Sequence, residues 1–303
     1  MKKVKKTVWS KFLFILPLIG IITSCMSLRL IPSHKIPIPD YERPTHPPRV
    51  ALVLGSGGSR GLAHVGVIEE LEHAGVPIDV IIGTSAGALV GAIYADCLCA
   101  EQLKKTLYTL KSGDVIDYNL WNSRYGLVTG FRLRQFLAKR LQARTFEQLK
   151  IPLIVVATDI HSGELVRLGS SHLIPALHAS CAIPGVFRPV RLYGHYLVDG
   201  GVLEPVPVET AIEYGADIII AVDICEKLSD AFPTNLFGVM KRGFEICFKK
   251  LSNYSTQHAD IVIQPELKNI GTFNDKTNPY VYEAGRKAAR EALPAIIEAL
   301  HKK

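Results

Sequence analysis

The chain has 303 residues, of which 48% are hydrophobic and 21% charged, and this excludes an intrinsically disordered protein, which would combine low hydrophobicity with high charge. The formal net charge is +7, but five lysines lie within the first 24 residues, which contain no acidic residue. Without those residues the net charge falls to about +2, which excludes the strongly basic surface typical of nucleic-acid-binding proteins.

The N-terminus has the pattern of an export signal. Lysines precede an uncharged apolar run at residues 12–22, which is shorter than the ~20 residues needed to span a bilayer. Residues 22–25 (ITSC) follow the pattern of an aliphatic residue, two small residues and a cysteine, and so resemble a bacterial lipobox. The resemblance implies a signal peptide at residues 1–24 and a mature chain that begins at a lipid-modified Cys25, with ordinary signal cleavage as the alternative.

Residues 25–48 are expected to form an extended spacer. Six prolines occur between Leu30 and Pro48, and proline-rich chain is semi-rigid. We therefore expect an exported protein whose lipidated Cys25 anchors it to a bacterial membrane. In a Gram-negative cell we expect the outer membrane, because Met26 rather than an aspartate follows the cysteine.

From residue 49 onward the chain alternates between predicted strands and helices. Nearly continuous apolar runs predict buried strands at residues 50–54, 80–82, 153–158 and 218–222. Helical periodicity occurs at residues 61–74, 86–95, 237–252 and 281–300. This pattern predicts one α/β domain at residues 49–303, in which helices cover both faces of a mainly parallel sheet and the site lies at the carboxyl ends of the strands.

The first glycine-rich segment, residues 55–61 (GSGGSRG), follows the first predicted strand. It does not fit a dinucleotide-binding loop, because Arg60 occupies the place of the third glycine, and it lacks the lysine of a P-loop. Adjacent glycines expose backbone N–H groups, which can stabilise an oxyanion. A turn that is glycine-rich for steric reasons alone is the alternative.

A G-x-S-x-G motif at residues 83–87 (GTSAG) connects the second predicted strand to a helix. This is the context of a nucleophile elbow, a strained turn that projects a serine hydroxyl, here that of Ser85. Gly83 and Gly87 fit this interpretation because side chains there would collide across the turn. The helix N-terminus favours negative charge that develops near Ser85. The alternative is an ordinary turn in which Ser85 is the helix N-cap.

The third motif is an aspartate, Asp199, which ends a short apolar run and is followed by Gly200 and Gly201. Its carboxylate can act as the base for a serine, although Asp-Gly is also a common turn signal. A histidine base is the competing interpretation, and the histidines considered after Ser85 are His161, His172, His178, His195 and His258. No group of residues with metal-ligand spacing occurs, so we expect no metal and no cofactor.

Four blocks of the sequence together resemble the patatin-like phospholipase family. They are residues 51–72 (ALVLGSGGSRGLAHVGVIEELE), 78–95 (IDVIIGTSAGALVGAIYA), 179–190 (ASCAIPGVFRPV) and 196–208 (YLVDGGVLEPVPV). The resemblance implies a three-layer α/β/α fold and a catalytic dyad of Ser85 as nucleophile and Asp199 as base. It also implies an oxyanion hole at Gly57 and Gly58.

The resemblance assigns supporting positions as well: Arg60, Gly83, Gly87 and Gly200. Ser56 stands where the common form of the family has glycine, but the two expected oxyanion donors are intact. The implied activity is metal-independent hydrolysis of fatty-acyl esters of phospholipids or lysophospholipids through an acyl-enzyme. An esterase or thioesterase that acts on other acyl substrates, and a non-catalytic membrane-tethered module, are the alternatives.

Beyond Cys25, the chain has an odd number of cysteines, which argues against complete pairing in disulfides. We expect buried free thiols at Cys97, Cys99, Cys181, Cys225 and Cys247, with one or two disulfides among them as the alternative. The expected partners are a membrane and an acyl-ester substrate, not nucleic acid. The sequence does not predict an oligomeric state.

Overall fold

The computed structural model describes residues 37–39, 49–118, 124–225, 228, 232–267 and 278–302. The predicted signal peptide, Cys25 and most of the predicted spacer therefore lie outside the described residues. Within the described ranges, no helix has both the length and the hydropathy of a membrane span.

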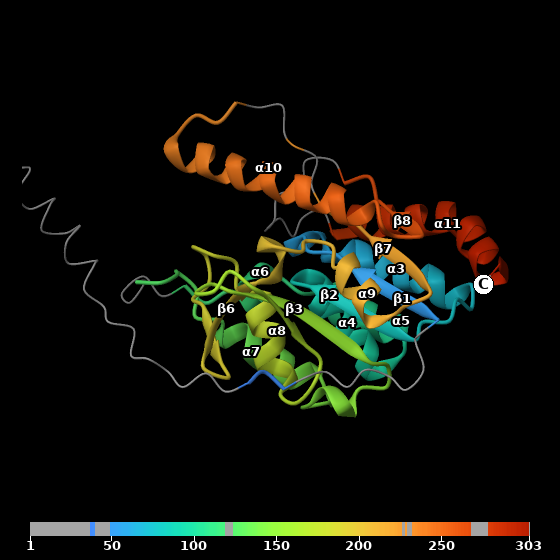
Figure 1. Ribbon diagram of the computed structural model, residues 1–303, viewed down its shortest axis with the longest axis horizontal. Helices are drawn as coiled ribbons and strands as arrows, with labels where there is room; N and C mark the ends of the chain where they lie inside the picture. The colour runs from blue at the N-terminus through green and yellow to red at the C-terminus, as the bar shows by residue number, and fades with distance from the viewer. Residues whose placement is uncertain are drawn as a thin grey trace, which may run out of the picture. The chain divides into compact units, whose positions relative to one another are not determined.

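The described residues form an eight-stranded mixed sheet (Figure 1). Five strands run parallel in the order β3, β2, β1, β7, β8. They are β3 (Leu153–Asp159), β2 (Val80–Thr84), β1 (Val50–Leu54), β7 (Ile218–Val222) and β8 (Ile261–Ile263). The antiparallel strands beside β3 are β4 (Leu165–Leu168), β6 (His195–Asp199) and, beyond β6, β5 (Val190–Leu192). The α/β fold class and the mainly parallel sheet are thus confirmed.

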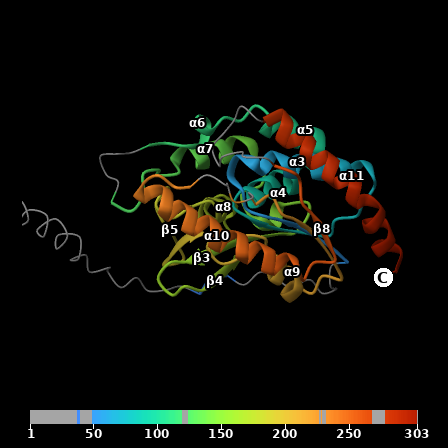
Figure 2. The same cartoon turned by 90° about the horizontal axis from the view of Figure 1, so that it is seen from above.

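Helices cover both faces of the sheet. The α-helices are α3 (Leu62–His73), α4 (Ala86–Cys97), α5 (Ala100–Leu107), α6 (Ser112–Val115), α7 (Phe131–Arg140), α8 (Leu173–Ser180), α9 (Val208–Tyr214), α10 (Leu236–Thr256) and α11 (Asn278–Lys302). Within the described residues there are also short 3-10 helices, η1 (Gly58–Gly61), η3 (Phe146–Gln148) and η4 (Gly200–Val202). Figure 2 shows α9 and α10 on one side of the sheet and α3, α5 and α11 on the other.

Alternating residues of the central strands explain why their apolar runs are continuous. In β1, Leu52 and Leu54 pack into the core on the side of α3 and α11, whereas Ala51 and Val53 pack toward α9. All five residues of β1 are buried, because neither face of the sheet is open to water. The parallel strands end at one edge, where the segments after β1 and β2 lie next to each other.

Gly87 lets the first turn of α4 approach the end of β1. A Cβ at this position would lie 2.0 Å from the Leu54 carbonyl oxygen. We expect Gly87→Ala to lower the free energy of unfolding by about 3 kcal/mol, because backbone on both sides must shift. Urea unfolding measures this. At Gly113 a Cβ meets nothing within 4 Å, so Gly113→Ala is the matched control, and equal losses in the two variants would contradict the argument.

Candidate active site

Ser85 occupies a strained turn between β2 and α4. Its φ of 56° lies in a region that residues other than glycine rarely adopt. The Ser85 main-chain N–H donates to Ser180 Oγ at 2.9 Å, and the Ser180 hydroxyl in turn donates to the Val156 carbonyl at 2.7 Å. The Ser85 side chain makes no capping hydrogen bond with α4. Its hydroxyl therefore does not serve as the N-cap that was the structural alternative.

Two predicted glycines make this turn possible. At Gly83 a Cβ would lie 2.7 Å from the backbone nitrogen of Ala88, and Gly87 faces the end of β1 as described above. Any side chain at either position would push α4 away from the sheet. The close packing thus gives a steric reason for both glycines of the motif.

Asp199 reaches Ser85 from the last residue of β6. Its carboxylate accepts the Gly201 N–H at 2.8 Å and lies close enough to the Ser85 hydroxyl to interact with it. Only 4% of Asp199 is exposed. Burial raises the pKa of the Asp199 carboxyl to about 6, against the opposing effects of the nearby Ser85 hydroxyl and of the Gly201 N–H. A carboxylate with this pKa can accept a proton near neutral pH.

The glycine-rich loop after β1 lies beside the same edge of the sheet. The Gly55 N–H donates to the Val222 carbonyl at 3.0 Å, and the Ser56 N–H donates to the Pro205 carbonyl at 2.8 Å. By contrast, the Gly57 and Gly58 amides donate no hydrogen bond to another described residue. Gly58 has a φ of 59°, which favours glycine. These two N–H groups are available to an oxyanion.

Two buried side chains contact backbone carbonyl groups of this loop. The Arg60 side chain donates from Nε to the Gly57 carbonyl at 3.1 Å. His64, in α3, contacts the Gly55 carbonyl oxygen through Nε2 at 2.7 Å. Burial lowers the pKa of His64 to about 4, so its imidazole is neutral at pH 7 and Nε2 must carry the hydrogen. Sequence reasoning did not find this role of His64.

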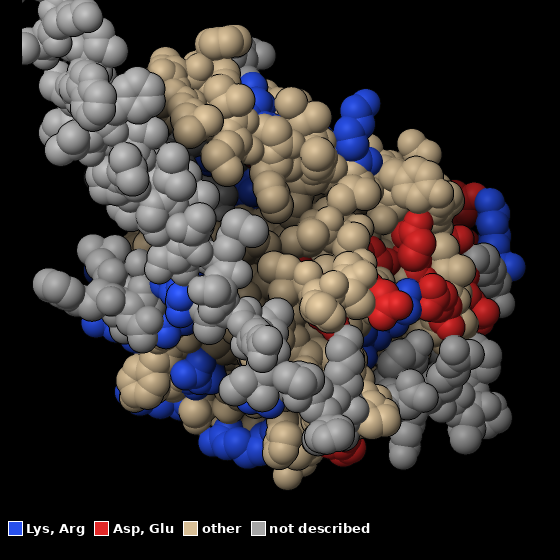
Figure 3. Space-filling view, turned by 60° about the vertical axis from the view of Figure 1, so that its left-hand side comes forward, with Lys and Arg blue, Asp and Glu red and all other residues tan. Residues whose placement is uncertain are grey.

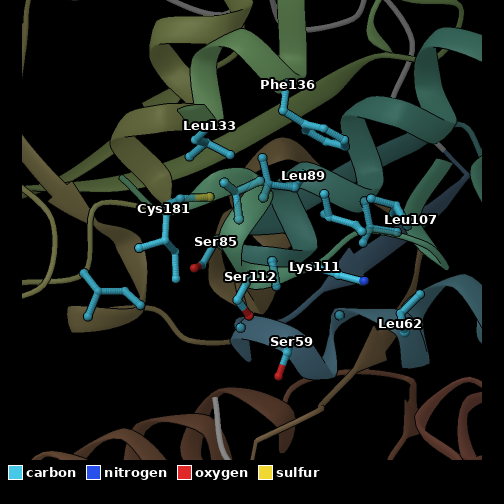
Figure 4. Close-up of a pocket in the computed structure, with 18 of the residues that line it drawn as sticks. Ser59, Leu62, Ser85, Leu89, Leu107, Lys111, Ser112, Leu133, Phe136 and Cys181 are labelled. Carbon is cyan, nitrogen blue, oxygen red and sulfur yellow. The ribbon is translucent and has the colours of Figure 1, made fainter. Parts of the chain in front are cut away.

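An apolar cavity opens beside Ser85 (Figure 4). It has a volume of about 160 Å³. Its walls include Leu62, Leu89, Leu107, Leu133, Phe136 and Ile183, which come from elements far apart in the sequence. Gly58 and Cys181 also line it, and the Cys181 thiol lies near the Ser85 hydroxyl. Burial raises the pKa of Cys181 well above its usual value, so this group is a thiol. A hydroxyl beside an apolar cavity suits the cleavage of a fatty-acyl ester.

No histidine among the described residues lines this cavity. His195 pairs through Nδ1 with Asp159 Oδ2 at 2.8 Å, and His178 contacts Arg134. The closeness of the Ser85 and Asp199 side chains therefore favours the aspartate as base over the competing histidine triad.

The described part of the chain contains no group of three or more His, Cys, Asp or Glu side chains placed to hold a metal ion. The five described cysteines are free, and Cys181 and Cys225 are buried as expected. Cys97 and Cys99 are partly exposed. Cys247, which belongs to α10, is exposed. The expectation that all five are buried was therefore wrong for these three.

Comparison with known proteins agrees with this geometry. A sequence model of the patatin-like phospholipase family matches residues 52–212, more than half of the chain. The chain belongs to the patatin-like phospholipase family. An uncharacterized NTE family protein of Mycobacterium tuberculosis is 38% identical over 183 residues, which cover 58% of this chain and 49% of that protein.

Another patatin-like relative is the lysophospholipase NTE1 of Scheffersomyces stipitis, which is 31% identical over 249 residues. That match covers 77% of this chain and 16% of the relative. This chain thus spans about half the length of the mycobacterial relative and about a sixth of the yeast one. In fold it is similar to the crystal structure of VipD from Legionella pneumophila, with a TM-score of 0.58 at 16% identity over 90% of this chain and 73% of that one.

Proposed function

We propose that this protein hydrolyses fatty-acyl esters of phospholipids or lysophospholipids, with Ser85 as nucleophile and Asp199 as base. The observation that carries the proposal is the closeness of the Ser85 hydroxyl to the buried Asp199 carboxylate beside an apolar cavity. Membership of the patatin-like phospholipase family supports a lipid ester as substrate. The name of the yeast relative, a lysophospholipase, supports the same class.

In the first half of the proposed reaction, Ser85 Oγ attacks the acyl carbonyl carbon and Asp199 accepts the hydroxyl proton. The Gly57 and Gly58 N–H groups stabilise the negative oxygen of the tetrahedral intermediate. The intermediate then expels the alcohol part of the lipid, which takes the proton from Asp199. The fatty-acyl group remains as an ester on Ser85.

In the second half, water attacks the acyl-enzyme and gives its proton to Asp199. The resulting intermediate releases the fatty acid, and the proton returns to Ser85 Oγ. Each half begins and ends with Asp199 ionised. Apart from the attacking water, the proposed mechanism uses only groups that this chain supplies.

The substrate class is tested with the purified protein and defined lipids. We expect mass spectrometry to detect free fatty acid from a phospholipid or a lysophospholipid with the wild type, but not with Ser85→Ala. Acyl-CoA and short p-nitrophenyl esters are assayed in parallel. Turnover of these substrates without lipid hydrolysis would favour the esterase or thioesterase alternative, and no turnover at all would favour the non-catalytic module.

The pH dependence of activity is a separate prediction. Burial raises the pKa of Asp199 to about 6, so the base is ionised above that pH and protonated below it. We expect kcat/KM for a soluble ester to fall about tenfold for each pH unit below 6. Samples returned from acid to pH 7.5 should regain full activity. A profile that stays flat down to pH 4.5 would contradict the role of Asp199.

We also propose that Cys25, which lies outside the described residues, is the acylated first residue of the mature chain, in the outer membrane if the cell is Gram-negative. The lipobox-like sequence at residues 22–25 supports this. Radiolabelled palmitate should be incorporated into the wild type and not into Cys25→Ser. Equal labelling of the two proteins, or none of the wild type, would contradict the proposal.

A further inference from the structure

Helix α10 exposes an apolar surface along its outward side. None of the described side chains between Leu236 and Leu251 is buried. Exposed apolar residues recur there at the helical spacing of three and four, and the segment before the helix adds Phe232, which is 87% exposed. We define the outer face of α10 as Phe232, Leu236, Val239, Met240, Phe244 and Cys247.

The opposite side of α10 attaches the helix beside the candidate active site. The Phe248 ring lies 2.7 Å from where a Cβ on Gly201 would be, two residues after Asp199. Lys249 Nζ pairs at 3.1 Å with Asp223, a carboxylate that is only 1% exposed. Toward its C-terminus α10 thus packs on the domain, whereas in Figure 1 its other end extends outward.

A helix arranged in this way needs a partner. An isolated helix of about 12–15 residues is only marginally stable in water, and a contiguous exposed apolar patch marks an interaction site. Leu236, Met240 and Phe244 are 73%, 62% and 53% exposed, so the outer face is not covered by the described parts of the chain. The partner must therefore present an apolar environment.

The charges of α10 indicate what that partner is. The helix has four cationic side chains against the single acid Glu245. Because Lys249 pairs with Asp223, the remaining Lys241, Arg242 and Lys250 together with Glu245 give the rest of the helix a net charge of +2. In Figure 3 the upper surface, where Figure 1 places α10, is largely uncharged with Lys and Arg side chains nearby, whereas acidic side chains gather elsewhere. A basic amphipathic helix is typical of a segment that lies in a membrane interface.

We propose that the outer face of α10 binds a lipid surface with anionic head groups. The apolar side chains enter the boundary between head groups and acyl chains, and the exposed Lys241 and Lys250 contact lipid phosphates. A second copy of this chain fits the same face less well, because two cationic helices would repel each other. This inference rests on the proposed function in one respect. If Ser85 cleaves lipid esters, a membrane-bound α10 places the active site beside the membrane that contains the substrate.

Cys247 provides a direct probe, because it is the only exposed cysteine among the five that the structure describes. The full chain, with Ser85→Ala and Cys25→Ser, is labelled at Cys247 with an environment-sensitive fluorophore. Vesicles of phosphatidylethanolamine and phosphatidylglycerol should raise the emission and shift it to the blue. Nitroxide on the lipid acyl chains should quench it. If another apolar segment of the chain bound the vesicles, that binding would not by itself place position 247 in contact with the lipid acyl chains. The response at position 247 therefore reports on α10 itself.

The matched control is labelled on α11, through Lys287→Cys in a Cys247→Ser background, because Lys287 is exposed on the other side of the sheet. No response at position 247, or an equal response at position 287, overturns the proposal. A response that depends on protein concentration without vesicles indicates self-association and also overturns it.

A second experiment uses otherwise unmodified full-length chains. Met240→Asp combined with Phe244→Asp should lower hydrolysis of vesicle phosphatidylglycerol about tenfold and leave hydrolysis of a soluble ester unchanged. The control pair, Ile212→Asp with Ile297→Asp, replaces exposed apolar residues on α9 and α11 and should change neither rate. Equal effects of the two pairs overturn the proposal. A fluorescence response without any ester hydrolysis by the wild type would refute only the proposed function.

Discussion

Ser85→Ala is expected to lower kcat for ester hydrolysis at least about 10⁴-fold, because the variant has no oxygen to form the acyl-enzyme. The fold should survive the change. The main-chain N–H of residue 85 still donates to Ser180 Oγ, and the lost hydroxyl makes no capping hydrogen bond. Initial rates with p-nitrophenyl butyrate and with a lysophospholipid measure the effect.

Ser162→Ala is the matched control, because Ser162 is exposed in the turn after β3. This variant should retain the wild-type rate. Urea unfolding of both variants tests whether the fold is intact. A folded Ser85→Ala variant with more than about a tenth of the wild-type activity would exclude Ser85 as the nucleophile.

Asp199→Asn is expected to lower kcat about 10³–10⁴-fold. An amide of the same shape can still accept the Gly201 hydrogen bond through its oxygen, but it cannot accept the serine proton. Soluble-ester kinetics between pH 6 and pH 9 measure the loss, which higher pH should not restore. Loss of activity in a His195 variant equal to that of Asp199→Asn, with the fold intact, would instead support the histidine triad.

The same substitution should stabilise the protein at neutral pH. The pKa of Asp199 is raised to about 6, so the folded state binds its proton more tightly than the unfolded state does. Above pH 6 the ionised carboxylate therefore costs up to about 3 kcal/mol of stability, and this cost disappears as the pH falls below 6. Asp199→Asn should raise the melting temperature at pH 7.5 and should lose this advantage in acid. Asp159→Asn, at a buried carboxylate that pairs with His195, is the control and should keep most of the activity.

The central strands were predictable because burial on both faces leaves continuous apolar runs. The predicted strands at residues 50–54 and 218–222 coincide with β1 and β7. β2 and β3 extend to Thr84 and Asp159, since polar residues at a strand end still pair in the sheet. The hairpin of β5 and β6 was not predicted: β5 has only three residues and none is buried, so it leaves no hydrophobic pattern.

At the site, the motifs identified Ser85 because its strained turn requires a local glycine pattern. The contact of Cys181 with Ser85 depends on how α8 packs under β3, which no local pattern encodes. His64 left a weak signal, a single histidine in an apolar helical segment, where a buried imidazole needs a carbonyl partner. Periodicity likewise predicted a helix at residues 237–252 but not that its apolar side faces outward.

The most direct test of the Ser85 mechanism is to trap the nucleophile. The protein is treated with a long-chain alkyl fluorophosphonate, and the intact chain and its peptides are weighed by mass spectrometry. We predict one adduct per chain, on Ser85, that forms in step with the loss of activity, forms much more slowly in Asp199→Asn and is absent from Ser85→Ala. Complete inactivation with the adduct on another residue, such as Cys181, would contradict the proposed mechanism.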